Sequence, residues 1–209
     1  MTTVIMVRHG QSEANLARRF AGHTNVSLTD LGQKQAEQAA EFLRDYPIDV
    51  IYASDLQRAM KTAEPTAAIH GLEIIANREL REIDAGNWEM VSYDTLLSER
   101  YDEYILWRTD IGHAHPSGGE SVLALSERVT DELDRLLERH RGECIAIFSH
   151  YTPIRAMLCR IAGLPFEKMQ EQTPVENGSV SVATLDDEGG WRIRVLGYVG
   201  EAQNGEILA

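Results

Sequence analysis

The sequence TVIMVRHG at residues 3–10 decides the fold, because a short apolar run ends at once in Arg8-His9-Gly10. A short continuous apolar run is typical of a strand that is buried on both faces of a sheet. A second such run, CIAIFSH at residues 144–150, also ends in a histidine, His150. In open α/β sheets, ligands bind outside the carboxyl ends of the strands. We therefore expect His9 and His150 to lie at one edge of a sheet.

Strand and helix signals alternate along the chain, which predicts an α/β fold: a three-layer α/β/α sandwich with a mostly parallel central sheet. The expected strands are residues 3–7, 50–52 and 144–148, followed by a hairpin of 180–185 and 191–199. The long run at 120–140 has apolar residues at helical spacing and predicts an amphipathic helix.

Three further helices are predicted from their capping residues. Thr29 is expected to cap the first, and Ser54 with Gln57 to form a capping box for the second. Thr152 is expected to cap the third, with Pro153 at its first helical position. Pro65 is predicted to kink or end the second helix.

The length of 209 residues suits a single domain, residues 1–209. Residues 84–118 are less regular and are expected to form an insertion over the active-site end of the sheet. Cys144 and Cys159 lie in apolar stretches and are expected to be buried, reduced thiols. No apolar run approaches the ~20 residues of a membrane helix, and the N-terminal residues do not resemble a signal peptide, so a cytoplasmic location is expected.

The formal net charge of −13 argues against nucleic acid or an anionic membrane as a partner, because both require a basic surface. The same charge repels anionic substrates at long range. A site for a phosphate ester must therefore build its own positive field. Arg8 and Arg58, the latter in the first turn of a predicted helix, are placed to do so beside His9 and His150.

Several stretches together resemble the histidine phosphatase superfamily, which includes cofactor-dependent phosphoglycerate mutases and many small phosphatases. The matching stretches are RHGQSEAN (8–15), LTDLGQKQA (28–36), SDLQRAMKTA (54–63), LREIDAGNWE (80–89) and SH (149–150). The loop PSGGES (116–121) resembles one that is common in the phosphatase branch. The resemblance implies a phosphoglycerate mutase-like fold for the whole domain.

The resemblance also implies a role for each matching residue. His9 would be the nucleophile that forms a phosphohistidine, and Glu82 the proton donor to the leaving oxygen. Arg8, Asn15, Arg58 and His150 would hold the phosphoryl oxygens. General chemistry agrees, because phosphoryl transfer needs positive charge around the equatorial oxygens and imidazole attacks only through an unprotonated nitrogen. A hydrogen bond from the other ring nitrogen, for example to a backbone carbonyl, would fix that tautomer of His9.

Substrate recognition is less well determined by the sequence. Arg18 and Arg19 follow the phosphate-binding stretch, and either solvation or a substrate contact is open for them. Tyr151 stands where the family usually has a small glycine, and Met90 stands where it often has glycine. Tyr151 is thus a third possible substrate contact.

The sequence favours a metal-independent phosphatase that acts on a small phosphorylated metabolite and needs no cofactor. His113 and His115 lack the ligand spacing of a metal site. A cofactor-dependent phosphoglycerate mutase is the alternative, but the chain is shorter than typical mutases and carries the loop of the phosphatase branch. An inactive binding module is disfavoured, because all six core positions are filled. The oligomeric state is left open between monomer and homodimer.

Overall fold

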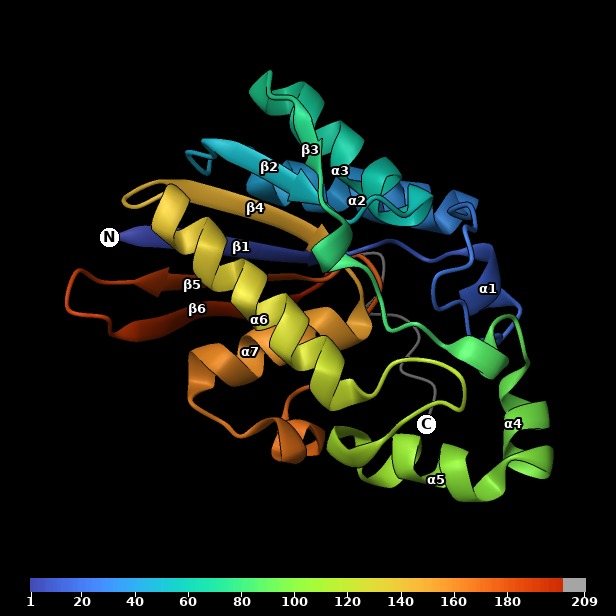
Figure 1. The fold of residues 1–209 in the computed structure, drawn as a ribbon. Coiled ribbons are helices and arrows are strands. Elements are labelled where there is room, and N and C mark those ends of the chain that lie inside the picture. Colours follow the sequence, from blue (N-terminus) through green and yellow to red (C-terminus); the bar gives the residue numbers. More distant parts are fainter. Residues whose placement is uncertain (201–209) are drawn as a thin grey trace.

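The computed structural model describes residues 1–200 and has a central six-stranded sheet. The strand order is β3-β2-β4-β1-β5-β6 (Figure 1). The strands are β1 (Thr2–Arg8), β2 (Val50–Ala53), β3 (Ile74–Ala76), β4 (Cys144–Ser149), β5 (Val180–Leu185) and β6 (Trp191–Tyr198). Strands β1 to β4 pair in parallel, whereas β5 is antiparallel to both β1 and β6. The mostly parallel sheet and the C-terminal hairpin are therefore confirmed.

Seven α-helices accompany the sheet within residues 1–200. They are α1 (Glu13–Leu16), α2 (Asp30–Leu43), α3 (Gln57–His70), α4 (Tyr93–Glu99), α5 (Tyr101–Thr109), α6 (Val122–Arg139) and α7 (Tyr151–Ala162). Helices α2 and α3 cover one face of the sheet, and α6 and α7 cover the other (Figure 1).

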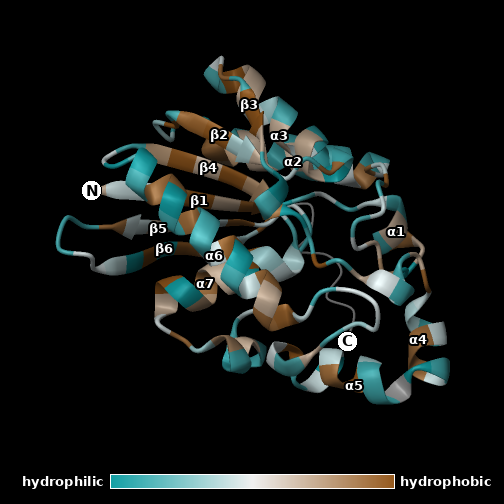
Figure 2. Ribbon diagram, in the orientation of Figure 1, coloured by the Kyte–Doolittle hydropathy of each residue, from teal (hydrophilic) through white to brown (hydrophobic). Residues whose placement is uncertain are grey.

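The side chains of β1 show how the sheet separates two hydrophobic cores. Val4 and Met6 belong to the core under α6 and α7, while Ile5 and Val7 belong to the core under α2 and α3. This alternation follows from the two-residue period of a strand. Figure 2 shows apolar residues concentrated on the central strands, as expected for a sheet that is buried on both faces. The three-layer α/β/α architecture is thus confirmed.

The register of the central pair brings the two histidines together. In the parallel pairing of β1 with β4, Arg8 lies opposite Ser149. The two strands end level with each other, and the backbone N–H of His9 donates to the carbonyl of Ser149 at 2.9 Å. His9 and His150 therefore leave the sheet side by side.

The predicted helix starts agree with the structure at α2 but not at α3 or α7. The Thr29 side chain accepts from the backbone N–H of Gly32 and caps α2 as predicted. The capping box at Ser54 is wrong, because α3 has Leu56 as its N-cap and no side-chain cap bond. The start predicted for α7 is also wrong: the helix begins at Tyr151, with His150 as its N-cap.

The structure also differs from the predictions at Pro65 and in the segment 84–118. Pro65 does not end α3, which continues to His70 and stops at Gly71, a residue with a left-handed φ of 65°. The segment 84–118 contains two helices, α4 and α5, although the sequence indicated little regular structure. Both helices lie beyond the carboxyl ends of β1 and β4 (Figure 1).

Both cysteines are free and buried, as predicted. Among the helices in residues 1–200, none has the length and apolar character needed to cross a bilayer.

Candidate active site

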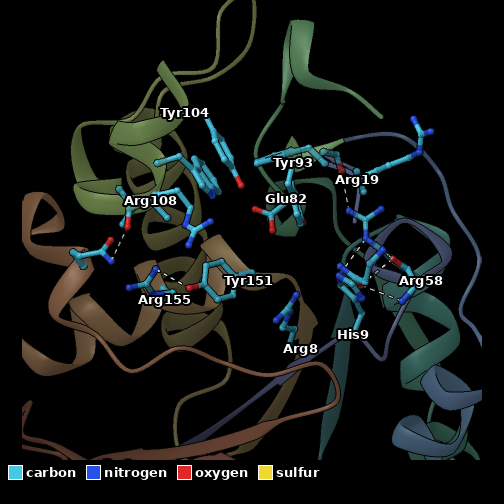
Figure 3. Close-up of a pocket in the computed structure, with 18 residues that line it drawn as sticks. Arg8, His9, Arg19, Arg58, Glu82, Tyr93, Tyr104, Arg108, Tyr151 and Arg155 are labelled. Atoms are coloured by element: carbon cyan, nitrogen blue, oxygen red, sulfur yellow. Dashed lines mark hydrogen bonds between the residues drawn. The ribbon is translucent and has the colours of Figure 1, made fainter. Parts of the chain in front are cut away.

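A cavity of about 490 Å³ lies at the carboxyl edge of the sheet. Its wall includes seven residues that the sequence singled out: Arg8, His9, Asn15, Arg19, Arg58, Glu82 and Tyr151 (Figure 3). His150 is completely buried directly behind this wall. Segments far apart in the sequence thus meet at the edge where β1 and β4 end.

The imidazole of His9 is held in one tautomer. Its Nδ1 lies 2.7 Å from the carbonyl oxygen of Gly10, which can only accept, so Nδ1 carries the proton. Its Nε2 is therefore unprotonated in the neutral ring and faces the Nε of Arg58 at 3.3 Å. Burial holds the pKa of His9 well below its usual range, and the charges of Arg58 and Arg8 lower it further. His9 is thus a neutral imidazole at neutral pH, and its Nε2 lone pair accepts from the Nε–H of Arg58.

The glycine after His9 is required by a close approach of two chain segments. A Cβ atom on Gly10 would collide with the backbone carbonyl of Gly32 in the first turn of α2. A Cβ atom on Gly32 would in turn collide with the carbonyl of Gln11. This contact joins the RHG stretch to the LTDLG stretch and fixes the chain just after the histidine.

His150 is buried beside His9, with their ring centroids 5.1 Å apart. Its Nδ1 accepts from the Nε of Arg58 at 3.2 Å, so its Nε2 carries the proton and donates to the hydroxyl of Ser54 at 2.8 Å. Burial, followed by the charge of Arg58, holds the pKa of His150 well below its usual range. Ser54, expected from the sequence to cap a helix, instead orients this imidazole.

Arg58 joins the two imidazoles and is itself fixed by backbone. Its terminal nitrogens donate to the carbonyls of Thr24 at 3.0 Å and Gly22 at 2.8 Å. Burial lowers its pKa to about 10, so the guanidinium stays charged at neutral pH. The loop that supplies the two carbonyls is held by Glu89, which accepts from the backbone N–H groups of His23 and Thr24. Glu89 therefore supports the position of Arg58, a role that the sequence did not reveal.

Arg8 and Asn15 complete the wall around His9. Arg8 donates to the carbonyl of Val175 at 2.6 Å, and its buried Nε has no partner within the described chain. Burial lowers the pKa of Arg8, and the charge of Glu82 opposes that shift. The side-chain oxygen of Asn15 accepts from the Ser12 backbone and from Asn177, which turns its amide nitrogen toward the cavity. Each side chain thus offers N–H donors to an anion.

Glu82 lines the cavity between Tyr93 and Tyr151 (Figure 3). Its two carboxylate oxygens accept from the backbone N–H groups of Ile83 at 2.8 Å and Thr152 at 3.4 Å. These bonds fix the carboxylate with respect to both segments. Glu79 and Asp84, its acidic neighbours in the sequence, line a separate hollow.

Arg18 and Arg19, whose roles the sequence left open, lie in different positions relative to the cavity. Arg19 lines the cavity and donates to the carbonyl of Met90 at 2.7 Å. Arg18 does not line the cavity; it is exposed and lies 3.6 Å from Asp94. Met90 has a φ of 58°, a left-handed conformation that explains why glycine suits this position.

Tyr151 is fixed between two guanidinium groups. The guanidinium carbons of Arg8 and Arg155 each lie 5.0 Å from the centroid of its ring. A cation over an aromatic face is attracted by the ring quadrupole. Tyr151 therefore has a defined place in the cavity wall.

Part of the cavity wall consists of residues to which the sequence assigned no definite role. Side chains of α4, α5 and α7 face the cavity, and so does one residue that follows α7; they are Tyr93, Tyr104, Trp107, Arg108, Arg155 and Gln170. A signal for Arg155 did exist, since it lies four residues after Tyr151 and so on the same helix face. The α5 residues lie within the segment 84–118, which the sequence placed over the active-site end of the sheet, but no signal singled out Arg108.

His113 and His115 have other partners than a metal. His113 pairs with Asp110 at 2.9 Å, and His115 lies 3.2 Å from the carbonyl of Gly119. Over residues 1–200, no three His, Cys, Asp or Glu side chains are grouped so that they could hold a metal ion.

The two buried histidines predict a loss of stability in mild acid. Their pKa values are lowered in the folded state, so below about pH 6.5 the unfolded chain takes up protons first. The free energy of unfolding should then fall by up to about 1.4 kcal/mol per pH unit for each histidine, until the folded pKa values are reached. Urea denaturation at pH 7.5, 6.5 and 5.5 measures this fall.

The control for this measurement is His9→Asn, which removes one of the two groups. Between pH 6.5 and 5.5 the free energy of unfolding of this variant should fall less steeply, by the slope that corresponds to roughly one proton. An equally steep decline in the variant would show that His9 already titrates normally in the folded protein.

Comparison with known proteins identifies similar chains over nearly the whole length. The family model of the histidine phosphatase superfamily (branch 1) matches residues 4–198. Phosphoglycerate mutase-like protein 4 of Arabidopsis thaliana is 36% identical over 98% of this chain and 89% of its own. Phosphoserine phosphatase 1 of Hydrogenobacter thermophilus is 31% identical over 90% of this chain and 88% of its own.

A solved structure is similar as well. The mycobacterial glucosyl-3-phosphoglycerate phosphatase, in complex with VO3, superposes with a TM-score of 0.85. It is 26% identical, and the match covers 93% of this chain and 98% of that one.

Proposed function

Because this chain belongs to the histidine phosphatase superfamily and its relatives include named phosphatases, we propose that it hydrolyses a small phosphorylated metabolite through a phosphohistidine at His9. The observation that carries the proposal is the environment of His9. An imidazole with an unprotonated Nε2, which accepts from the Nε–H of Arg58, lines a cavity where Arg8 and Arg58 supply two fixed positive charges. A neutral nucleophile beside concentrated positive charge suits a phosphoryl group.

In the first step, the Nε2 lone pair of His9 forms a bond to phosphorus while the ester P–O bond breaks. The leaving alkoxide takes a proton from Glu82, because an alkoxide is otherwise a poor leaving group. The Nδ1 proton stays on the ring and is donated to the carbonyl of Gly10. This hydrogen bond stabilises the positive charge that develops on the imidazole.

In the second step, water attacks the phosphohistidine. Ionised Glu82 takes a proton from the water, the N–P bond breaks, and inorganic phosphate leaves with His9 neutral again. During both steps Arg8, Asn15 and Arg58 hold the phosphoryl oxygens. His150, whose Nε2 donates to Ser54, acts on the phosphoryl group through Arg58, which its Nδ1 holds in place. The Nε–H of Arg58 is donated to both histidines, so it is placed to turn to a phosphoryl oxygen between them, which releases the Nε2 lone pair of His9 for attack.

A phosphoglycerate mutase is the second candidate, because three of the relatives have names that call them phosphoglycerate mutases or mutase-like. A mutase must return the phosphoryl group to product and keep it from water. The two reactions differ in what they release. A phosphatase liberates inorganic phosphate, whereas a mutase converts 3-phosphoglycerate to 2-phosphoglycerate once primed by 2,3-bisphosphoglycerate.

The test is an assay of both reactions by the purified protein in the presence of EDTA. We expect release of inorganic phosphate from p-nitrophenyl phosphate and from members of a metabolite phosphate panel, with no need for a metal. Primed mutase turnover that exceeds phosphate release would overturn the choice of phosphatase. Loss of activity in EDTA that added metal restores would overturn metal independence. The absence of any turnover would favour a binding module.

The proposal also covers the location, the partners and the oligomeric state of the protein. We propose a cytoplasmic enzyme, with neither nucleic acid nor membrane as a partner, that acts as a monomer or homodimer. The net charge of −13 supports the exclusion of polyanionic partners.

A further inference from the structure

The cavity is far more basic than the protein around it. Five arginines line it against one carboxylate, Glu82, although the chain has a net charge of −13. Two of the five, Arg8 and Arg58, surround His9. Arg108 and Arg155 lie on the other side of Tyr151 (Figure 3). A single phosphoryl group at His9 does not account for this second group of charges.

Arg155 is a buried charge without an anionic partner. Its side chain is 2% exposed, and its hydrogen bonds all go to neutral acceptors: the carbonyls of Met169 and Gln172 and the hydroxyl of Tyr151. Its Nε has no partner at all in residues 1–200. A buried charge without a counter-charge is costly to folding. Such a group is retained where a ligand supplies the missing negative charge.

Arg108 is a second unpaired cation at the same end. It lies in α5, lines the cavity and makes no ion pair in the part of the chain that the structure describes. Its position contrasts with that of Arg18, which is paired with Asp94 outside the cavity. The guanidinium of Arg108 is therefore available to a bound anion.

Tyr151 offers a neutral donor between the two ends. Arg155 donates to the Tyr151 oxygen at 3.1 Å, and an arginine has no acceptor to offer in return. The hydroxyl proton of Tyr151 is thus left for another acceptor. The stacking of Arg155 against the ring and its bond to the hydroxyl together fix the direction of that proton.

We propose that this end of the cavity is a subsite for a carboxylate carried by the phosphorylated substrate. Arg108 and the Tyr151 hydroxyl contact the carboxylate, and Arg155 positions Tyr151 and adds buried positive charge. The inference rests on the proposed phosphatase function and names its substrate class, which is a small phosphorylated carboxylic acid.

The size and charge of the subsite both favour this class. The guanidinium carbons of Arg8 and Arg155 each lie 5.0 Å from the Tyr151 ring centroid, so their separation is no more than twice that distance. A phosphate beside Arg8 and a carboxylate at the Tyr151 hydroxyl can therefore belong to one small molecule. A single carboxylate suits the subsite better than a second phosphate, because the donors of Arg155 are largely occupied. Tyr104 and Trp107 line the same cavity and give it an aromatic wall.

The test compares substrates that differ only in the carboxylate. O-phosphoserine is paired with phosphoethanolamine, and 3-phosphoglycerate with glycerol 3-phosphate, with release of inorganic phosphate as the readout. We expect kcat/KM to favour the carboxylate member of each pair by at least about tenfold, as a charge-assisted hydrogen bond would provide. In Arg108→Gln this ratio should fall toward one, chiefly through a higher KM for the carboxylate member.

The control variant is Arg139→Gln, which removes the same charge from an exposed site in α6 away from the cavity. Its substrate ratio should equal that of the unmodified protein. An equal fall in both variants would mean general attraction of anions and would overturn the subsite. The subsite would also be overturned if the protein hydrolysed p-nitrophenyl phosphate but showed the same kcat/KM for both members of each substrate pair. Failure to hydrolyse any of these compounds would instead refute the proposed function.

Discussion

Replacing His9 with alanine should lower kcat by at least about 10⁴-fold on every substrate and abolish the covalent phosphoenzyme. Loss of a covalent nucleophile removes the step on which all later chemistry depends, and such losses are this large in other enzymes. His150 cannot replace His9 as the nucleophile, because its Nε2 is turned toward Ser54 and its Nδ1 toward Arg58. Quenching in alkaline SDS after incubation with ³²P-labelled substrate measures the phosphoenzyme directly, because the N–P bond of a phosphohistidine survives base but not acid.

His113→Ala is the matched control for this variant. His113 is an exposed histidine paired with Asp110, and it does not line the cavity. We expect labelling and kcat close to those of the unmodified protein. Label that persists in His9→Ala would place the nucleophile on another residue and refute the mechanism.

Replacing Glu82 with glutamine should give a loss whose size depends on the leaving group. For an alkyl phosphate such as phosphoserine, kcat should fall about 10²- to 10⁴-fold, the usual contribution of a general acid. For p-nitrophenyl phosphate the fall should be much smaller, because p-nitrophenolate leaves without a proton. Glutamine keeps the shape of the side chain and removes its ability to transfer the proton, and its single oxygen can accept from only one of the Ile83 and Thr152 backbone N–H groups.

The control for leaving-group dependence is Glu79→Gln. Glu79 is three residues earlier and lines a separate hollow, so both substrates should be affected equally and little. If Glu82→Gln slowed the two substrates by the same factor, Glu82 would act by positioning rather than as the proton donor.

The residues around His9 could be predicted because their position depends mainly on local sequence. His9 and His150 each follow a continuous apolar strand, and parallel strands end at a common edge. Arg58 follows the next strand within a few residues. In each case the short distance between strand and functional side chain leaves the chain little freedom to place it elsewhere.

Other parts depended on contacts between distant segments, which local patterns do not contain. Ser54 has the sequence of a helix cap, yet its hydroxyl contacts His150, 96 positions away in the chain. Glu89 supports Arg58 only through the loop at residues 22–24. Arg108 and Tyr104 reach the cavity because α5 packs beyond the sheet edge. That packing is set by the aromatic contacts of Phe20, Trp88 and Trp107, which spacing along the sequence does not predict.

The pairing of Arg8 with Ser149 has a consequence for how the chain can change in length over evolution. Inserting or deleting one residue in β1 or β4 would displace one imidazole from the other by about 3.3 Å and turn it to the opposite face. Such indels should therefore be eliminated by selection in either strand. The exposed turn at residues 186–190 joins β5 to β6 and is not part of this pairing, so loop-length variants should be tolerated there.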